Sequence, residues 1–141
     1  MSWDATLYRV ITTAQCPECG HALEPPKVTE EEIGWWNYTH NTNGMIAAAY
    51  EAVSGEQTEQ CGGPLGPVIG AAWWDRLDGA SGRDGREYLS QIITGLEAGP
   101  ARFRARNPPN GWGDYDGLLK VLREMRDSLE DIAAERWHVS G

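Results

Sequence analysis

Apolar side chains recur every three or four positions over most of the chain after residue 43, the spacing that places them on one face of an α-helix. The last of these stretches is the clearest, because leucine, methionine and isoleucine follow one another there at steps of four and three residues. The pattern predicts four helices, over about 43–53, 67–77, 86–98 and 114–135, and a shorter helical turn at 101–106.

The two ends of the chain have a different pattern. Residues 6–13 are rich in β-branched and aromatic types, which favours a short strand, and 137–139 are expected to form a terminal strand beside it. The segments 16–20 and 24–26 contain prolines, which predict a tight loop and exclude a helix. The sum is a mainly α fold of about four helices with a small β element formed by the N- and C-terminal segments, in a single compact domain.

The chain is acidic, with 21 aspartates and glutamates against 12 lysines and arginines and a formal net charge of −9. Affinity for the phosphate backbone of nucleic acids comes from clustered lysine and arginine, so direct nucleic-acid binding is not expected. A protein that occludes the basic groove of another protein is compatible with this charge. No apolar stretch approaches the roughly 18 residues of a membrane span and no signal peptide stands out, so we expect a cytoplasmic location without membrane association.

Two cysteines stand two residues apart in Cys16-Pro17-Glu18-Cys19-Gly20. Such a pair, followed by glycine, allows both thiolates to bind one tetrahedral zinc ion while backbone amides bond to the sulfurs. The sequence therefore predicts a structural zinc site at Cys16 and Cys19. Free thiols and redox chemistry are the alternatives, although a redox pair is expected at the start of a helix in a βαβ context.

A closed structural zinc site needs four ligands, and the candidates for the remaining two are Cys61, His40 and His21. The segment around Cys61 is similar to a second knuckle in which threonine stands in place of the first cysteine. A histidine would then complete the site, or the segment is the remnant of a lost site. This interpretation divides the chain into a zinc-knuckle arm at 1–34 and a helical body at 37–137.

The segment 35–45 combines three aromatic rings with a histidine, three asparagines and two threonines, and contains no Asp, Glu, Lys or Arg. It opens a predicted helix, whose free backbone N–H groups favour a polar or anionic ligand. The imidazole of His40 can act as a general acid or base near neutral pH, which makes it the candidate catalytic residue. The ligand-binding candidates are Trp36, Asn37, Thr39, His40, Asn41 and Asn43. The alternative is that these residues cap and pack the start of the helix.

A second polar and aromatic segment, 107–115, precedes the last predicted helix. Trp112 is flanked by glycine on both sides, Asp114 is placed to cap the helix, and Tyr115 follows it. We expect Trp112, Asp114 and Tyr115 to line one cleft together with the segment 35–45. The alternative is a helix-start turn whose aromatic rings pack into the core.

The two motifs Asn-Tyr-Thr-His-Asn and Gly-Trp-Gly-Asp-Tyr together resemble a family of small proteins carried by bacteriophages and their hosts, which has no settled activity. The resemblance covers about residues 37–125. It implies that His40, Asn41, Trp112 and Tyr115 act together, in a phage or prophage setting within a bacterial host cell. The cysteine segments depart from the pattern of this family, so the resemblance does not support zinc.

Three classes of function follow from these features. The first is a small cytosolic binding module, a phage-type accessory or anti-defence protein that sequesters a polar small molecule or blocks a host protein. The second is a small enzyme that uses His40 as general acid or base, oriented by Asp114 or Glu32. The third is a zinc-ribbon adaptor. A closed pocket would indicate sequestration, an exposed aromatic patch would indicate a protein partner, and a His40–carboxylate pair in a deep cleft would indicate an enzyme.

Overall fold

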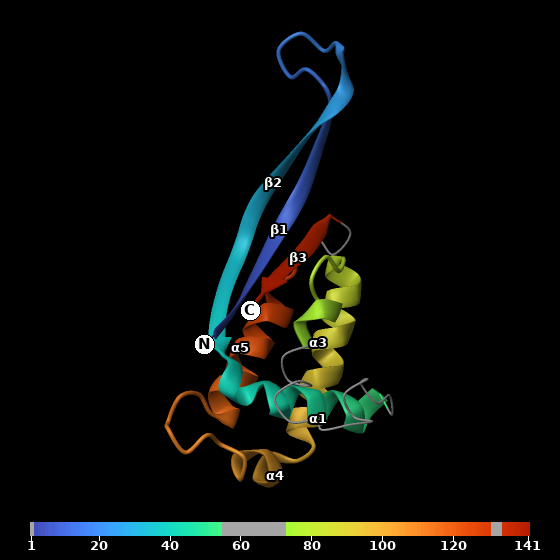
Figure 1. Cartoon of the computed structure of the whole chain (residues 1–141). Helices are drawn as coiled ribbons and strands as arrows, with labels where there is room; N and C mark the ends of the chain where they lie inside the picture. Colours follow the sequence, from blue (N-terminus) through green and yellow to red (C-terminus); the bar gives the residue numbers. More distant parts are fainter. Residues whose placement is uncertain (1, 55–72, 131–133) are drawn as a thin grey trace.

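The computed structural model describes residues 2–54, 73–130 and 134–141. Three antiparallel strands form one sheet in the order β2–β1–β3, and helices cover one face of it (Figure 1). The strands are β1 (Ser2–Gln15), β2 (Ala22–Thr39) and β3 (Glu135–Ser140). The α-helices of the described residues are α1 (Asn43–Ser54), α3 (Gly82–Glu97), α4 (Pro100–Arg104) and α5 (Tyr115–Asp127), and two 3-10 helices are η1 (His40–Thr42) and η3 (Trp73–Arg76).

The core lies between the sheet and the helices. Alternate residues of β1 face inward, so that Trp3, Ala5 and Leu7 are fully buried, and β3 contributes Trp137 and Val139 in the same way. Helices α3 and α5 complete the core with the apolar stripes that the sequence periodicity indicated. The buried residues of these two stripes are Leu89, Ile92, Ile93, Leu96, Leu118, Leu122 and Met125.

The prediction of a mainly α fold is wrong, because the sheet is much larger than the sequence pattern indicated. The missed element is β2, a strand of 18 residues that includes Pro25, Pro26 and the first part, 35–39, of the aromatic segment 35–45. Proline is tolerated in β2 because this strand lies at the edge of the sheet, where one row of backbone N–H groups needs no partner. The ladder is also irregular at the prolines, since the pairing jumps from Thr13–Lys27 to Gln15–Ala22.

The terminal strand and most predicted helices are confirmed. β3 pairs with β1 from Asp4–Ser140 to Arg9–Glu135, as expected for 137–139 beside 6–13. The last helix is shorter than predicted, because α5 ends at Asp127 and the chain enters β3 at Glu135. Much of the second predicted helix, 67–72, lies outside the described residues, and η3 follows it. No helix of the described residues combines the length and apolar character that a membrane crossing requires.

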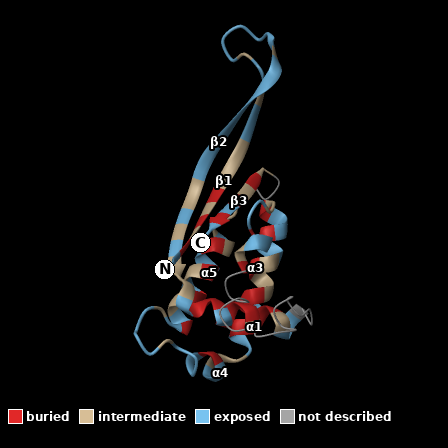
Figure 2. Ribbon diagram, in the orientation of Figure 1, coloured by how far each residue is buried: buried red, intermediate tan, exposed pale blue. Residues whose placement is uncertain are grey.

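Beyond the end of β3, the strands β1 and β2 continue as a two-stranded ribbon that projects from the helical body (Figure 1). We call residues 11–29 the arm. Its side chains are mostly exposed (Figure 2), including those of Ile11 and Val28, and a tight turn at 16–20 forms its tip. An isolated hairpin is only marginally stable in water, so the arm depends on the body sheet from which it extends.

Candidate functional site

The structure brings together the two polar and aromatic segments that the sequence singled out. The side-chain amide of Asn41 donates to the backbone oxygen of Trp112 at 3.3 Å. The Tyr38 hydroxyl accepts a hydrogen bond from the backbone N–H of Asp114 at 3.1 Å and donates to the backbone oxygen of Asp114 at 3.2 Å. Two segments more than 70 positions apart in sequence therefore meet at one junction.

This junction is packed rather than hollow. A Cβ atom at Gly113 would overlap the Thr39 methyl group, and one at Gly117 would overlap the Tyr38 hydroxyl. Partial burial raises the pKa of Tyr38, and the nearby Asp114 carboxylate acts in the same direction. The polar groups that suggested a ligand site are thus bonded to one another across the junction.

Two of the predicted ligand-binding residues are buried and bonded within the core. The Tyr115 hydroxyl donates to the backbone oxygen of Leu96 at 2.7 Å, its ring stacks on Phe103, and burial raises its pKa. The Asn43 side chain accepts a hydrogen bond from the Trp73 indole at 3.2 Å. Both residues hold the fold together at the start of a helix.

Asp114 caps α5, as its position in the sequence suggested. Its carboxylate accepts a hydrogen bond from the backbone N–H of Gly117 at 2.6 Å. Thr39 caps η1 in the same way, by accepting a hydrogen bond from the backbone N–H of Asn41 at 3.2 Å.

No carboxylate of the described residues pairs with His40, the arrangement that the enzyme hypothesis predicted. Its ring is half-buried and stacks on Trp74, with 5.2 Å between the ring centroids and an interplanar angle of 20°. The Nε2 atom is buried without a hydrogen-bond partner among the described residues, and neither Asp114 nor Glu32 bonds to the ring in that part of the chain.

Strand alternation separates the remaining predicted residues. Trp36 points inward and packs on Trp137, with 5.7 Å between the ring centroids. Asn37 points outward and donates to the Asp4 carboxylate at 2.8 Å. Trp112 belongs to the junction through its backbone, while its side chain is 68% exposed. The predicted set therefore does not line one cleft.

The predicted zinc site does not form within the described residues, which contain no group of three or more potential metal ligands. His40 follows the body end of β2, whereas Cys16 and Cys19 lie at the tip of the arm (Figure 1). Cys61 lies outside the described residues. The two tip cysteines carry free thiols, and the backbone amides of Cys19 and Glu18 lower the pKa of Cys16 by hydrogen bonding to its sulfur.

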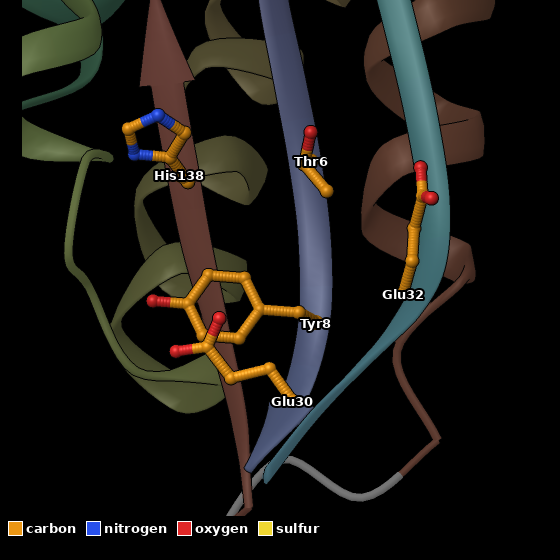
Figure 3. Close-up of a pocket in the computed structure, with 5 residues that line it drawn as sticks. All are labelled: Thr6, Tyr8, Glu30, Glu32 and His138. Atoms are coloured by element: carbon orange, nitrogen blue, oxygen red, sulfur yellow. The ribbon is translucent and has the colours of Figure 1, made fainter.

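An open candidate surface lies on the side of the sheet that faces away from the helices. We call it the outer face. It contains a shallow groove of about 470 Å³ across all three strands (Figure 3). The groove is lined by Thr6, Tyr8, Glu30, Glu32 and His138. Trp35 stands directly beside it, because Thr6 pairs with Trp35 on one side and with His138 on the other.

His138 is held in place at the edge of this groove. Its Nδ1 atom lies 3.1 Å from a carboxylate oxygen of Asp78, and the same oxygen accepts the backbone N–H of Val139 at 2.9 Å. The outward direction of His138 follows from the buried residues on either side of it, so the sequence contained this signal. The contact with Asp78, 60 positions earlier, did not have a local signal.

The charges on β2 also sort by face. Glu31 points toward Arg9, at 3.8 Å, and Arg9 also lies near Glu130 and Glu135. By contrast, neither Glu30 nor Glu32 forms an ion pair with the part of the chain that the structure describes. The outer face therefore offers two uncompensated carboxylates beside a phenol, an imidazole and an indole.

Comparison of the chain with protein-family models, with curated proteins and with solved structures found no match. The candidate site is thus defined here by the geometry of the outer face.

Proposed function

We propose that this protein is a binding module that docks a basic partner protein on the outer face of its sheet. The observation that carries the proposal is the groove across the three strands, which is open to solvent and has a largely exposed indole at its side. An open groove suits a protein surface better than a sequestered small molecule, which needs enclosure.

Trp35 is the natural anchor for such a partner. Its side chain is 58% exposed. Tryptophan is among the residues most enriched at the energetic centres of protein interfaces, so an exposed tryptophan is a candidate contact for a partner. A tryptophan side chain buries up to 150–250 Å², so covering the exposed part of Trp35 would stabilise a complex by roughly 3 kcal/mol before the costs of association. A single anchor of this size is typical of an interface hot spot.

The charge of the surrounding surface indicates a basic partner. Residues 11–32 contain five glutamates and one lysine, and the whole chain has a formal net charge of −9. The two groove carboxylates, Glu30 and Glu32, point to the same side as Trp35. Lysine and arginine side chains can pair with these carboxylates and stack on the indole, and the long-range field accelerates their approach.

The resemblance to phage-borne proteins supports a host protein as the partner. A small acidic protein that covers a basic surface can compete with the natural ligand of that surface. Blocking of a host protein is therefore the function that we propose for the module. The enzyme hypothesis based on His40 has less support, because its ring stacks on Trp74 instead of pairing with a carboxylate.

The test uses a defined probe: a lysine- and arginine-rich peptide and a matched peptide in which glutamate replaces the basic residues. NMR titration of the full chain with the basic peptide is expected to shift the signals of Thr6, Tyr8, Trp35 and His138. The acidic peptide is expected to leave them unchanged. Shifts that are equal for both peptides, or absent, would contradict the proposal.

Paired variants separate the outer face from the rest of the surface. Trp35→Ala is expected to weaken peptide binding about tenfold, which corresponds to about 1.4 kcal/mol. Glu32→Gln should weaken it more than Glu87→Gln, because Glu87 is also an exposed carboxylate but lies on α3, on the other side of the sheet. If Trp112→Ala abolishes binding and Trp35→Ala does not, the junction and not the outer face is the site.

A further inference from the structure

The tip of the arm carries two free thiols, those of Cys16 and Cys19. The turn is well defined, because the Cys16 backbone N–H donates to the His21 backbone oxygen at 2.8 Å and the Gly20 N–H donates to the Cys16 oxygen at 2.8 Å. Gly20 has a φ of +72°, which favours glycine and closes the turn tightly. Cys16 and Cys19 both belong to this turn, where Cys16 is partly accessible and Cys19 is exposed.

This geometry fits half of a metal site. A pair of thiolates separated by two residues in a glycine-closed turn can supply two of the four ligands of a tetrahedral thiophilic ion. The other two ligands do not come from the described part of the same chain, in which no third potential ligand joins the pair. Strand β2 is 18 residues long, on the order of 50 Å, so the residues at its body end lie far from the tip.

We propose that the tips of two copies of this chain meet and bind one metal ion through Cys16 and Cys19 of each copy. A second copy offers the same two thiols in the same geometry, so a two-fold axis through the ion completes four ligands and closes the assembly at a dimer. The arms project beyond the bodies, so an end-to-end contact keeps the two bodies apart (Figure 1). This inference does not depend on the outer face or on its partner.

The acidic character of the arm opposes the contact only weakly. Glu18 lies between the two cysteines and is exposed, so the repulsion between copies acts through water and is screened beyond about 8 Å at physiological salt. The divalent cation neutralises half of the charge of the four thiolates, and the metal–sulfur bonds, not charge balance, hold the two tips together. Metal and dimer should therefore appear together.

The test uses the full chain under reducing conditions, first depleted of metal and then titrated with Zn²⁺. We expect a monomer without metal and a dimer with zinc, at one zinc ion per two chains, measured by light scattering after size exclusion and by metal analysis. Substitution of Co²⁺ should give the visible absorption of a tetrahedral thiolate site. Cys16→Ser and Cys19→Ser should each lose both the metal and the dimer, with an unchanged circular dichroism spectrum.

Cys61→Ser is the matched control, and it should bind zinc and dimerise like the parent chain. One zinc ion per monomeric chain would overturn the proposal, since the ligand set would then close within one copy. Loss of zinc in Cys61→Ser would overturn it for the same reason. A chain that binds no zinc, or a dimer that forms equally without metal or without Cys16, would also contradict it.

Discussion

The two glycines that flank Trp112 allow a direct test of the junction. Gly111 and Gly113 both have positive φ angles, +73° and +86°, which an alanine adopts at a cost of about 1–2 kcal/mol. Their surroundings differ. A Cβ atom at Gly111 would meet no atom within 4 Å, whereas one at Gly113 would overlap the Thr39 methyl group and approach the Thr42 methyl group to 3.3 Å.

The expected magnitudes follow from this difference. Gly111→Ala carries the backbone cost alone, which is partly offset by about 0.4–1 kcal/mol from the stiffer unfolded chain, so it should destabilise by about 1 kcal/mol. Gly113→Ala carries the same cost and an overpacking cost of about 1–3 kcal/mol. We therefore expect it to be less stable than Gly111→Ala by about 2 kcal/mol.

Urea unfolding followed by circular dichroism measures both variants against the parent chain. In thermal unfolding of the same variants, the extra 2 kcal/mol corresponds to a further decrease of roughly 6–10 °C in the melting temperature of a chain of 141 residues. Peptide binding at the outer face should be unchanged in both folded variants. Equal destabilisation of the two variants would show that 107–115 does not pack against the start of η1, and the account of the junction would be refuted.

Two further predictions concern the helices. Gly95→Ala should destabilise the fold by about 2 kcal/mol, because its Cβ would overlap the backbone of α1. Gly44→Ala is the control, since its Cβ meets no atom within 4 Å and the change should be neutral or slightly stabilising. Equal unfolding midpoints of the two variants would contradict the close crossing of α1 and α3. Asp116→Asn should lower the stability at neutral pH, since hydrogen bonding from Arg104 holds the pKa of Asp116 below its usual range. This contribution is present above the unfolded pKa near 4 and is lost as the pH falls through the lower folded value, so the two unfolding curves should converge in acid; a difference that persists there excludes the carboxylate as its source.

The zinc prediction separates what a short motif determines from what the path of the chain determines. The sequence correctly indicated a tight turn at 16–20, because the turn depends only on a proline, a glycine and local backbone bonds. It then assigned His40 to the same site, although β2 carries that residue away from the tip. Ligand identity is a local property, but the meeting of ligands depends on the path of the chain.

The helices α1, α3 and α5 were determined by the sequence itself. A helix that buries one face needs apolar residues every three or four positions, whichever element it packs against. The caps at Asp114 and Thr39 were also local. Strand β2 was not predictable in this way, because its prolines and polar aromatic residues are compatible with a strand only at the edge of this particular sheet.

The outer face was decided by tertiary structure. The alternation around His138 and Trp35 determined that their side chains point away from buried neighbours, but it did not determine that β1 lies between them. Antiparallel pairing joins residues over 100 positions apart, Trp35 and His138 on either side of Thr6, and no local pattern records which strands become neighbours. The sequence thus specified which residues are polar, aromatic or apolar, and the pairing of the strands decided which of them form a surface together.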